Sequence, residues 1–178
     1  MEFQHAVLTA IAPRYKTDTN VIFEIQNEPD MGGWGGIPEH ENSLYQLIRS
    51  YAPNTPIIAW SVSTTSGVDI LGMIGRGNQI NYSNAAFGFH VYGGMSVAST
   101  KDMISEVRNA GYPIISTEFA VDGYSPDGLI DAFEATQTSW VVLTDGFCDA
   151  ATGACYGANS PQTLKITWPK DYTAERSQ

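Results

Sequence analysis

Short apolar runs alternate with amphipathic stretches along the chain, and this alternation restricts the fold more than any other feature. The runs are too short for helices, whereas the stretches between them repeat apolar residues at helical spacing. Nearly continuous apolar strands separated by helices are typical of parallel sheets buried on both faces. Five strands are predicted, at residues 21–25, 56–62, 86–92, 113–117 and 139–143. The predicted helices cover residues 3–11, 44–51, 69–76, 99–110 and 125–133.

Individual residues set the expected faces and ends of these helices. In the first helix, Phe3, Val7, Ala10 and Ile11 recur at helical spacing, which is typical of an amphipathic helix. The fourth helix is expected to take Ser99 as its N-cap and to stop at Gly111.

The predicted strands begin roughly 26 to 35 residues apart, which is about the length of one βα unit. A chain of 178 residues is long enough for one domain with a sizeable core. Two architectures fit, a doubly wound open sheet or part of a (β/α)8 barrel. Turn-forming residues dominate after Thr144, so we predict a single domain with a βα core at residues 1–144 and a loop-rich segment at residues 145–178.

Charge and motif content exclude several classes of partner. Nine Lys and Arg stand against 19 Asp and Glu, which gives a net charge of −10 and argues against binding to nucleic acid. The apolar runs are far shorter than the roughly 20 residues that cross a bilayer, so no membrane segment is expected. No glycine-rich nucleotide-binding motif follows the first strand, so no nucleotide cofactor is expected.

The metal-ligating residue types are few. His5, His40 and His90 show no metal-binding spacing, and two cysteines cannot complete a four-ligand zinc site, so neither a metal nor another cofactor is predicted. The spacing of Cys148 and Cys155 suits a small disulfide loop if the protein is secreted, with free thiols as the alternative.

Polar and aromatic residues stand at the ends of the predicted strands. In a parallel barrel the carboxyl ends of the strands gather the catalytic groups at one face. Two carboxylates at the ends of separate strands suggest paired acid, base or nucleophile chemistry. The residues at these positions are Asn27, Glu28, His90, Tyr92, Glu118 and Trp140.

These residues carry a resemblance to a known family. The stretch at residues 22–29, which ends in Asn27-Glu28-Pro29, resembles the cellulase-type members of glycoside hydrolase family 5. His90-x-Tyr92, Thr117-Glu118-Phe119 and Trp140 follow in the order that the family has. The resemblance implies a partial (β/α)8 TIM barrel, from Met1 in the third helix to about Leu143 in the eighth strand.

The resemblance also implies roles. Glu28 is the implied general acid/base and Glu118 the implied nucleophile of a retaining double displacement, with carboxyl groups about 5 to 5.5 Å apart. Glu28 must be protonated while Glu118 is ionised, which a desolvated acid beside a hydrogen-bonded anion supplies. Asn27 would bind the sugar 2-hydroxyl, Tyr92 would hold the nucleophile, and His90 would join the same network. The structural alternatives are a core histidine at His90 and a strand cap at Tyr92.

Tryptophans are the expected sugar-binding aromatics. Trp140 is implied to offer its face to a pyranose ring, with core packing as the alternative. Trp34 lies between glycines that leave its ring accessible for stacking on sugar, or it packs back onto the barrel. Trp60 is expected in the core. Glu24 alternates with the catalytic face and is expected to point among the helices.

The chain also departs from the family pattern. A complete barrel needs eight strands and about 250 residues, whereas this chain offers only the last five strands. An arginine and a histidine that the family places on the earlier strands have no counterpart here. The strands at residues 21–25 and 139–143 would be the open edges of the sheet. Unpaired backbone groups along such apolar edges are costly, so we expect something to cover them. We therefore expect a homodimer through these edges, or a C-terminal segment folded across one of them.

The sequence thus predicts a retaining endo-β-1,4-glucanase of the cellulase type that acts on β-glucan polysaccharide or oligosaccharide. The alternatives are an inactive or weakly active barrel fragment that binds oligosaccharide, a mannanase of the same family, or an open α/β sheet with another binding role. An acidic composition with little lysine fits a secreted, extracellular protein whose signal peptide is not in this chain.

Overall fold

The computed structural model describes residues 2–29, 37–76, 79–119, 128–141, 147–148 and 155–156. The chain divides into two units, Met1–Leu143 and Thr144–Gln178. In the second unit, β5 (Phe147–Cys148) and β6 (Cys155–Tyr156) pair in antiparallel fashion, with Cys148 opposite Cys155. This register agrees with the loop that the expected disulfide would close, and the disulfide stays a prediction.

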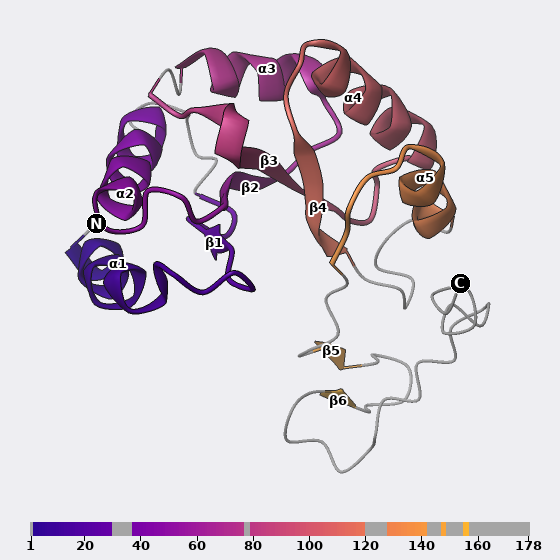
Figure 1. The fold of residues 1–178 in the computed structure, drawn as a ribbon. Helices are drawn as coiled ribbons and strands as arrows, with labels where there is room; N and C mark the ends of the chain where they lie inside the picture. The colour runs from indigo at the N-terminus through magenta and orange to yellow at the C-terminus, as the bar shows by residue number, and fades with distance from the viewer. Residues whose placement is uncertain are drawn as a thin grey trace. The chain divides into compact units, whose positions relative to one another are not determined.

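The first unit is built on a four-stranded parallel sheet (Figure 1). Its strands lie in chain order, β1-β2-β3-β4, so each strand pairs with the next one along the sequence. Four of the five predicted strands are thereby confirmed. The fifth contributes a single parallel bridge from Trp140 to Ser116, and residues 142 and 143 lie outside the described part. The strands are β1 (Phe23–Glu24), β2 (Ile57–Ser63), β3 (Ala85–Val91) and β4 (Ile114–Phe119).

Helices follow the strands in an arc along the outer face of the sheet (Figure 1). None of the helices in the described part is both long and apolar enough to span a membrane. They are α1 (Glu2–Tyr15), α2 (Ile37–Tyr51), α3 (Gly67–Arg76), α4 (Val97–Asn109) and α5 (Leu129–Ala135), with a short 3-10 helix η1 (Tyr82–Asn84) before β3.

Several helix starts differ from the prediction: α2 begins at Ile37, seven residues before the predicted start, and α3 begins at Gly67, two residues before it. Helix α4 begins three residues before the expected position, because the hydroxyl of Ser96 accepts the N–H of Ser99 and so caps the helix. It ends before Gly111, which adopts the expected left-handed conformation at φ +92°. Helix α5 begins at Leu129 after a left-handed Gly128, and the predicted start at residues 125–127 lies outside the described part.

The apolar residues of α1 differ in burial, and of the four at helical spacing Ile11 packs against the core. Leu8 and Ala12 are buried, whereas Phe3 is 79 % exposed and Val7 is 37 % exposed. The reason is the helix's neighbours: α1 packs against α2, and β1 is the first strand of the sheet. The opposite face of α1 therefore has no described element to cover it.

Large side chains fill the space between the sheet and the helices. Phe119 and Phe133 meet edge to face with ring centroids 5.3 Å apart, which joins β4 to α5. Trp60 is fully buried, as predicted, and its indole N–H donates to the Tyr82 hydroxyl at 2.8 Å. The largest fully buried side chains are Trp60, Phe87, Phe89, Phe119, Phe133 and Leu44.

A β-bulge interrupts β2 at Trp60 and Ser61, which both have positive φ, at 76° and 43°. Left-handed backbone in bulky residues is strained and persists only where the surroundings support it. The support is Glu41 of α2, whose fully buried Oε1 accepts the N–H of Trp60 at 2.6 Å. Burial raises the pKa of Glu41 to about 7, and the hydrogen bond from Trp60 partly opposes the rise.

The raised pKa of Glu41 predicts a pH-dependent stability. Below about pH 4.5, the ordinary pKa of this side chain, Glu41 is protonated in both the folded and the unfolded protein. Above about pH 7 the folded protein must bury Glu41 as an anion. The free energy of unfolding should therefore fall by about 3 kcal/mol between these limits, relative to the Glu41→Gln variant, whose amide oxygen still accepts from Trp60. Urea titrations of both proteins over this range measure the difference, and parallel pH curves would contradict it.

Candidate active site

The end of β1 places Glu28 beside the bulge of β2. The N–H of Glu28 donates to the Ser61 carbonyl at 3.0 Å, and Glu28 itself is left-handed at φ 40°. Asn27 lies next to it and is exposed, and Pro29 is buried. The side chain of Glu28 is 42 % exposed, so the expected desolvated acid is not found, because β1 lies at the edge of the described sheet.

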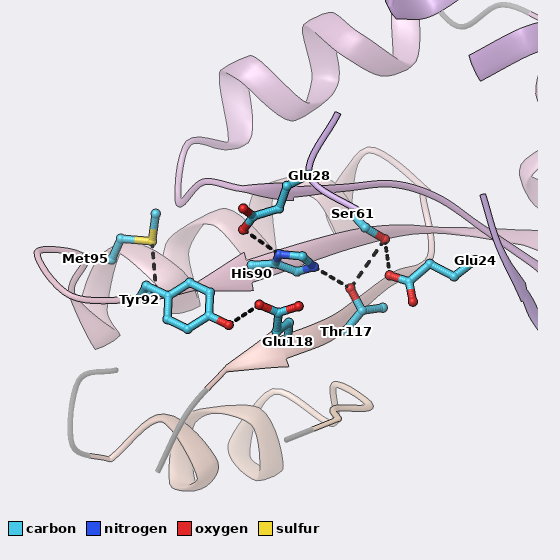
Figure 2. A network of polar contacts seen from close by, with 8 residues as sticks. All are labelled: Glu24, Glu28, Ser61, His90, Tyr92, Met95, Thr117 and Glu118. Atoms are coloured by element: carbon cyan, nitrogen blue, oxygen red, sulfur yellow. Dashed lines mark hydrogen bonds and ion pairs between the residues drawn. The ribbon is translucent and has the colours of Figure 1, made fainter. Parts of the chain in front are cut away.

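His90 lies near the carboxyl end of β3 and is fully buried. Its Nδ1 is 2.8 Å from Oε1 of Glu28, and its Nε2 is 3.1 Å from Oγ1 of Thr117 (Figure 2). His90 is thus a core histidine, as its structural alternative had it, and its polar partners are Glu28 and Thr117. Its role near a bound sugar stays a prediction.

The second carboxylate, Glu118, accepts a hydrogen bond from the Tyr92 hydroxyl (Figure 2). Tyr92 directly follows β3, so the expected contact between this tyrosine and this carboxylate is present. A register shift between β3 and β4 pairs Phe89 with Ser116 and His90 with Glu118, which leaves Thr117 as the extra residue. Because of this irregularity, the consecutive residues Thr117 and Glu118 can both turn toward the site.

The two carboxylates and the imidazole converge. One oxygen of Glu28, one nitrogen of His90 and one oxygen of Glu118 all lie within 4.8 Å of one another. Among the described residues, these are the side chains that could hold a metal ion. A cation bound there would occupy both carboxylates, so the groups can serve as metal ligands or as acid and nucleophile, but not as both at once.

The two predicted tryptophans have different outcomes. Trp140 is partly buried; its indole N–H donates to Glu134 at 3.0 Å, and its ring meets Phe119 edge to face with centroids 5.7 Å apart. The packing that was its alternative is therefore present, and its stacking on a sugar stays a prediction. Trp34 lies outside the described residues.

The prediction for Glu24 was wrong. Its Oε1 accepts the Ser61 hydroxyl at 2.5 Å, and the Thr117 hydroxyl donates to Ser61 at 3.4 Å, so Glu24 joins the network that contains His90 (Figure 2). Glu24 and Glu28 are four residues apart, so regular strand alternation already places them on the same face. The bulge in β2 brings Ser61 to Glu24 there. Sequence reasoning also missed Ser61 and Thr117, although hydroxyl residues inside apolar strand runs were an available signal.

Gly88 of β3 makes room for this arrangement. A Cβ built on Gly88 would lie 2.4 Å from Oγ and 3.0 Å from Cα of Ser61. Since the second of these atoms is backbone, no side-chain rotation could relieve the clash. The bulge and the hydroxyl of Ser61 therefore require glycine at the facing position.

We predict that Gly88→Ala lowers the free energy of unfolding by about 1 to 3 kcal/mol, because the bulge must shift to admit a methyl group. Gly72→Ala is the matched control, since nothing lies within 4 Å of the added Cβ in the exposed part of α3. Alanine also favours helix, so the control should be more stable by up to about 1 kcal/mol. Chemical denaturation of both variants measures the effects, and equal stabilities would contradict the prediction.

The site and the fold define a class of protein, the barrel enzymes that bring carboxylates together at the ends of parallel strands. The family model described as Cellulase (glycosyl hydrolase family 5) matches residues 1–160. The chain belongs to glycosyl hydrolase family 5.

Characterised relatives are similar over most of this chain. Endoglucanase E-5 of Thermobifida fusca is 34 % identical over 131 residues, which are 68 % of this chain and 26 % of that protein. An endoglucanase of Clostridium saccharobutylicum is 32 % identical over 120 residues, 66 % of this chain and 26 % of that protein. The chain thus spans about a quarter of the length of these two relatives.

Solved structures give the same result for the fold. The catalytic domain of T. fusca endoglucanase Cel5A is 25 % identical with a TM-score of 0.63, and the match covers 79 % of this chain and 50 % of that domain. A β-mannanase of Thermomonospora fusca, solved with mannotriose, shares the fold with a TM-score of 0.64 at 15 % identity, over 83 % of this chain and 53 % of that one. The first unit is therefore a partial (β/α)8 barrel, as predicted.

Proposed function

We propose that the chain supplies the catalytic carboxylates of a retaining endo-β-1,4-glucanase. The observation that carries the proposal is the approach of Glu28 and Glu118, whose nearest ligand oxygens lie within 4.8 Å. Retaining glycosidases hold their carboxyl groups about 5 to 5.5 Å apart, whereas inverting enzymes need about 6.5 to 9.5 Å to admit a water molecule. The separation favours a nucleophile at Glu118 over a water-activating base.

The proposed reaction has two steps. The Glu118 carboxylate attacks the anomeric carbon while Glu28 gives its proton to the leaving glycosidic oxygen, so the glycosidic bond breaks and a glycosyl ester forms. Glu28 then removes a proton from water, the water oxygen attacks the same carbon, and the ester bond to Glu118 breaks. The Tyr92 hydroxyl donates to the carboxylate of the nucleophile and so orients it, and 42 % exposure leaves Glu28 open to substrate.

Three further residues are proposed to bind the sugar. Asn27 is exposed beside Glu28, where its amide can reach the 2-hydroxyl of the reacting sugar. Trp140 would present its ring to a pyranose, and Trp34 would provide a second platform. A hydrogen bond to the 2-hydroxyl strengthens as the oxocarbenium-like transition state forms.

The relatives support β-1,4-glucan as substrate. Both sequence relatives described above are endoglucanases, and a variant of the T. fusca Cel5A catalytic domain is solved with cellotetraose. The mannanase among the structural neighbours makes mannan the second candidate. Because the chain spans only half of the solved catalytic domains, a sugar-binding but weakly active fragment is the remaining alternative. Action on a polymer favours an extracellular location.

We expect the chain to release reducing sugar from soluble cellulose derivatives, and Glu28→Gln and Glu118→Gln each to lower kcat by about 100-fold or more. Asp102→Asn, on the exposed side of α4, is the control and should keep full activity. Parallel assays on mannan test the second substrate, and NMR of the first-formed anomer tests retention. Turnover that survives both glutamine substitutions would refute the proposal; binding without turnover would support the sugar-binding fragment.

We also propose that two copies associate through open sheet edges. Among the described residues, β1 pairs with β2 alone, so its other side lacks a described partner strand. Apolar side chains are exposed at both ends of the described sheet: Ile22, directly before β1, is 55 % exposed, and Val141, directly after the bridge at Trp140, is 53 % exposed. Unpaired, apolar strand edges favour pairing with another chain.

Light scattering should therefore give the mass of two chains at micromolar concentration. Ile22→Lys should shift the equilibrium toward single chains, because a charge at an open edge opposes strand pairing. Val68→Lys is the control, since Val68 is also apolar and 71 % exposed but lies on α3. A single-chain mass for the unchanged protein would exclude the dimer.

A further inference from the structure

A hydrogen-bond chain leads from Glu24 to His90 and ends at Glu28 (Figure 2). The contacts are 2.5 Å from Ser61 Oγ to Glu24 Oε1, 3.4 Å from Thr117 Oγ1 to Ser61 Oγ, and 3.1 Å from His90 Nε2 to Thr117 Oγ1. The other ring nitrogen of His90 lies 2.8 Å from Glu28. We call the first four residues, Glu24, Ser61, Thr117 and His90, the Glu24 chain. The reaction proposed above assigns no role to Glu24, Ser61 or Thr117.

The Glu24 chain has one consistent direction. A carboxylate can only accept, so Ser61 must give its single hydroxyl proton to Glu24. Ser61 can then only accept from Thr117, whose own single proton is thereby used. Thr117 in turn must accept from His90, which requires a proton on Nε2.

This direction determines what Nδ1 of His90 faces. With Nε2 protonated, a neutral His90 presents the Nδ1 lone pair to Oε1 of Glu28 at 2.8 Å. A lone pair and a carboxylate oxygen at that distance repel each other unless a proton lies between them. The Glu28–His90 pair therefore keeps one proton on this contact, carried by either atom, and it is the proton that a general acid must donate.

We propose that Glu24 is a positioning residue that, through Ser61 and Thr117, holds His90 in the Nε2-protonated form and so keeps the acid proton on the Glu28–His90 contact. If every hydrogen bond of the Glu24 chain ran in the opposite direction, the single proton of a neutral His90 would lie on Nδ1. It would then donate to an ionised Glu28, and that carboxyl group would have no proton to give. The inference rests on the proposed role of Glu28, but the tautomer can be observed without turnover.

The surroundings of His90 agree with this assignment. Glu28 approaches Nδ1 from the end of β1, and the hydroxyl of Thr117 meets Nε2 from β4. The Tyr92 ring stands edge on, with centroids 6.5 Å apart, and its hydroxyl donates to Glu118. In the part of the chain that the structure describes, Glu28 and Glu118 each bring one oxygen within 4.8 Å of a His90 ring nitrogen. Glu24 acts on the ring through the two hydroxyls.

The test is long-range ¹H–¹⁵N NMR of the histidine rings near neutral pH, with His5 and His40 assigned by single replacement. The unchanged protein should show Nε2 of His90 protonated. Thr117→Val removes the acceptor at nearly equal volume, so Nε2 should lose its proton, and Thr117→Ser should restore it. Glu24→Gln can donate as well as accept, so it should give a mixture of both forms. An unprotonated Nε2 of His90 in the unchanged protein would overturn the proposal, and so would an Nε2 that stays protonated in Thr117→Val.

Kinetics separate this inference from the proposed function. If the chain hydrolyses glucan, the alkaline limb of the pH profile of kcat should lie at lower pH by about one unit in Thr117→Val and by a smaller amount in Glu24→Gln, with KM nearly unchanged. A role in folding alone would lower the amount of active protein without moving the limb, and that result would overturn the inference. Inactivity of the unchanged protein together with the expected NMR result would refute the hydrolase and leave the tautomer assignment in place.

Discussion

The bulge at Trp60 and Ser61 of β2 is the constraint on which the site depends. It turns Trp60 toward the helices and Ser61 toward the other strands, and the Ser61 carbonyl fixes the backbone of Glu28. Two residues of neighbouring elements, Glu41 and Gly88, allow the bulge to form. Glu41 accepts the Trp60 N–H, and Gly88 leaves space for the Ser61 side chain. A strained backbone is thus maintained by a buried acid and by the absence of a side chain.

The second irregularity, at Thr117 of β4, has a complementary effect. It lets two consecutive side chains serve one site: Thr117 bonds His90, and Glu118 accepts from Tyr92. The two carboxylates consequently have different partners, an imidazole for Glu28 and a phenol for Glu118. Different partners for two similar carboxyl groups are the usual means by which one is kept as an acid and the other as an anion.

The edges of the partial barrel explain most departures from expectation. Glu28 is more exposed than an acid in a closed cleft, and the apolar face of α1 with Phe3 and Val7 is uncovered. Glu28 follows β1 and α1 precedes it in the chain, at the end of the described sheet where a complete family 5 barrel continues with further βα units. The same boundary leaves the backbone of β1 open to pairing, so the exposure of the acid and the expected association of two chains have one physical origin.

The sequence alone determined the alternation of strands and helices and the convergence of Glu28, His90, Tyr92 and Glu118, because parallel strands carry their carboxyl ends to one face. It also determined the core position of Trp60. Only the tertiary structure decided where Ser61 and Thr117 point and which face of α1 is buried. Strand alternation and helical periodicity are local rules, whereas bulges and missing neighbours depend on register and contacts between segments that are distant in the chain.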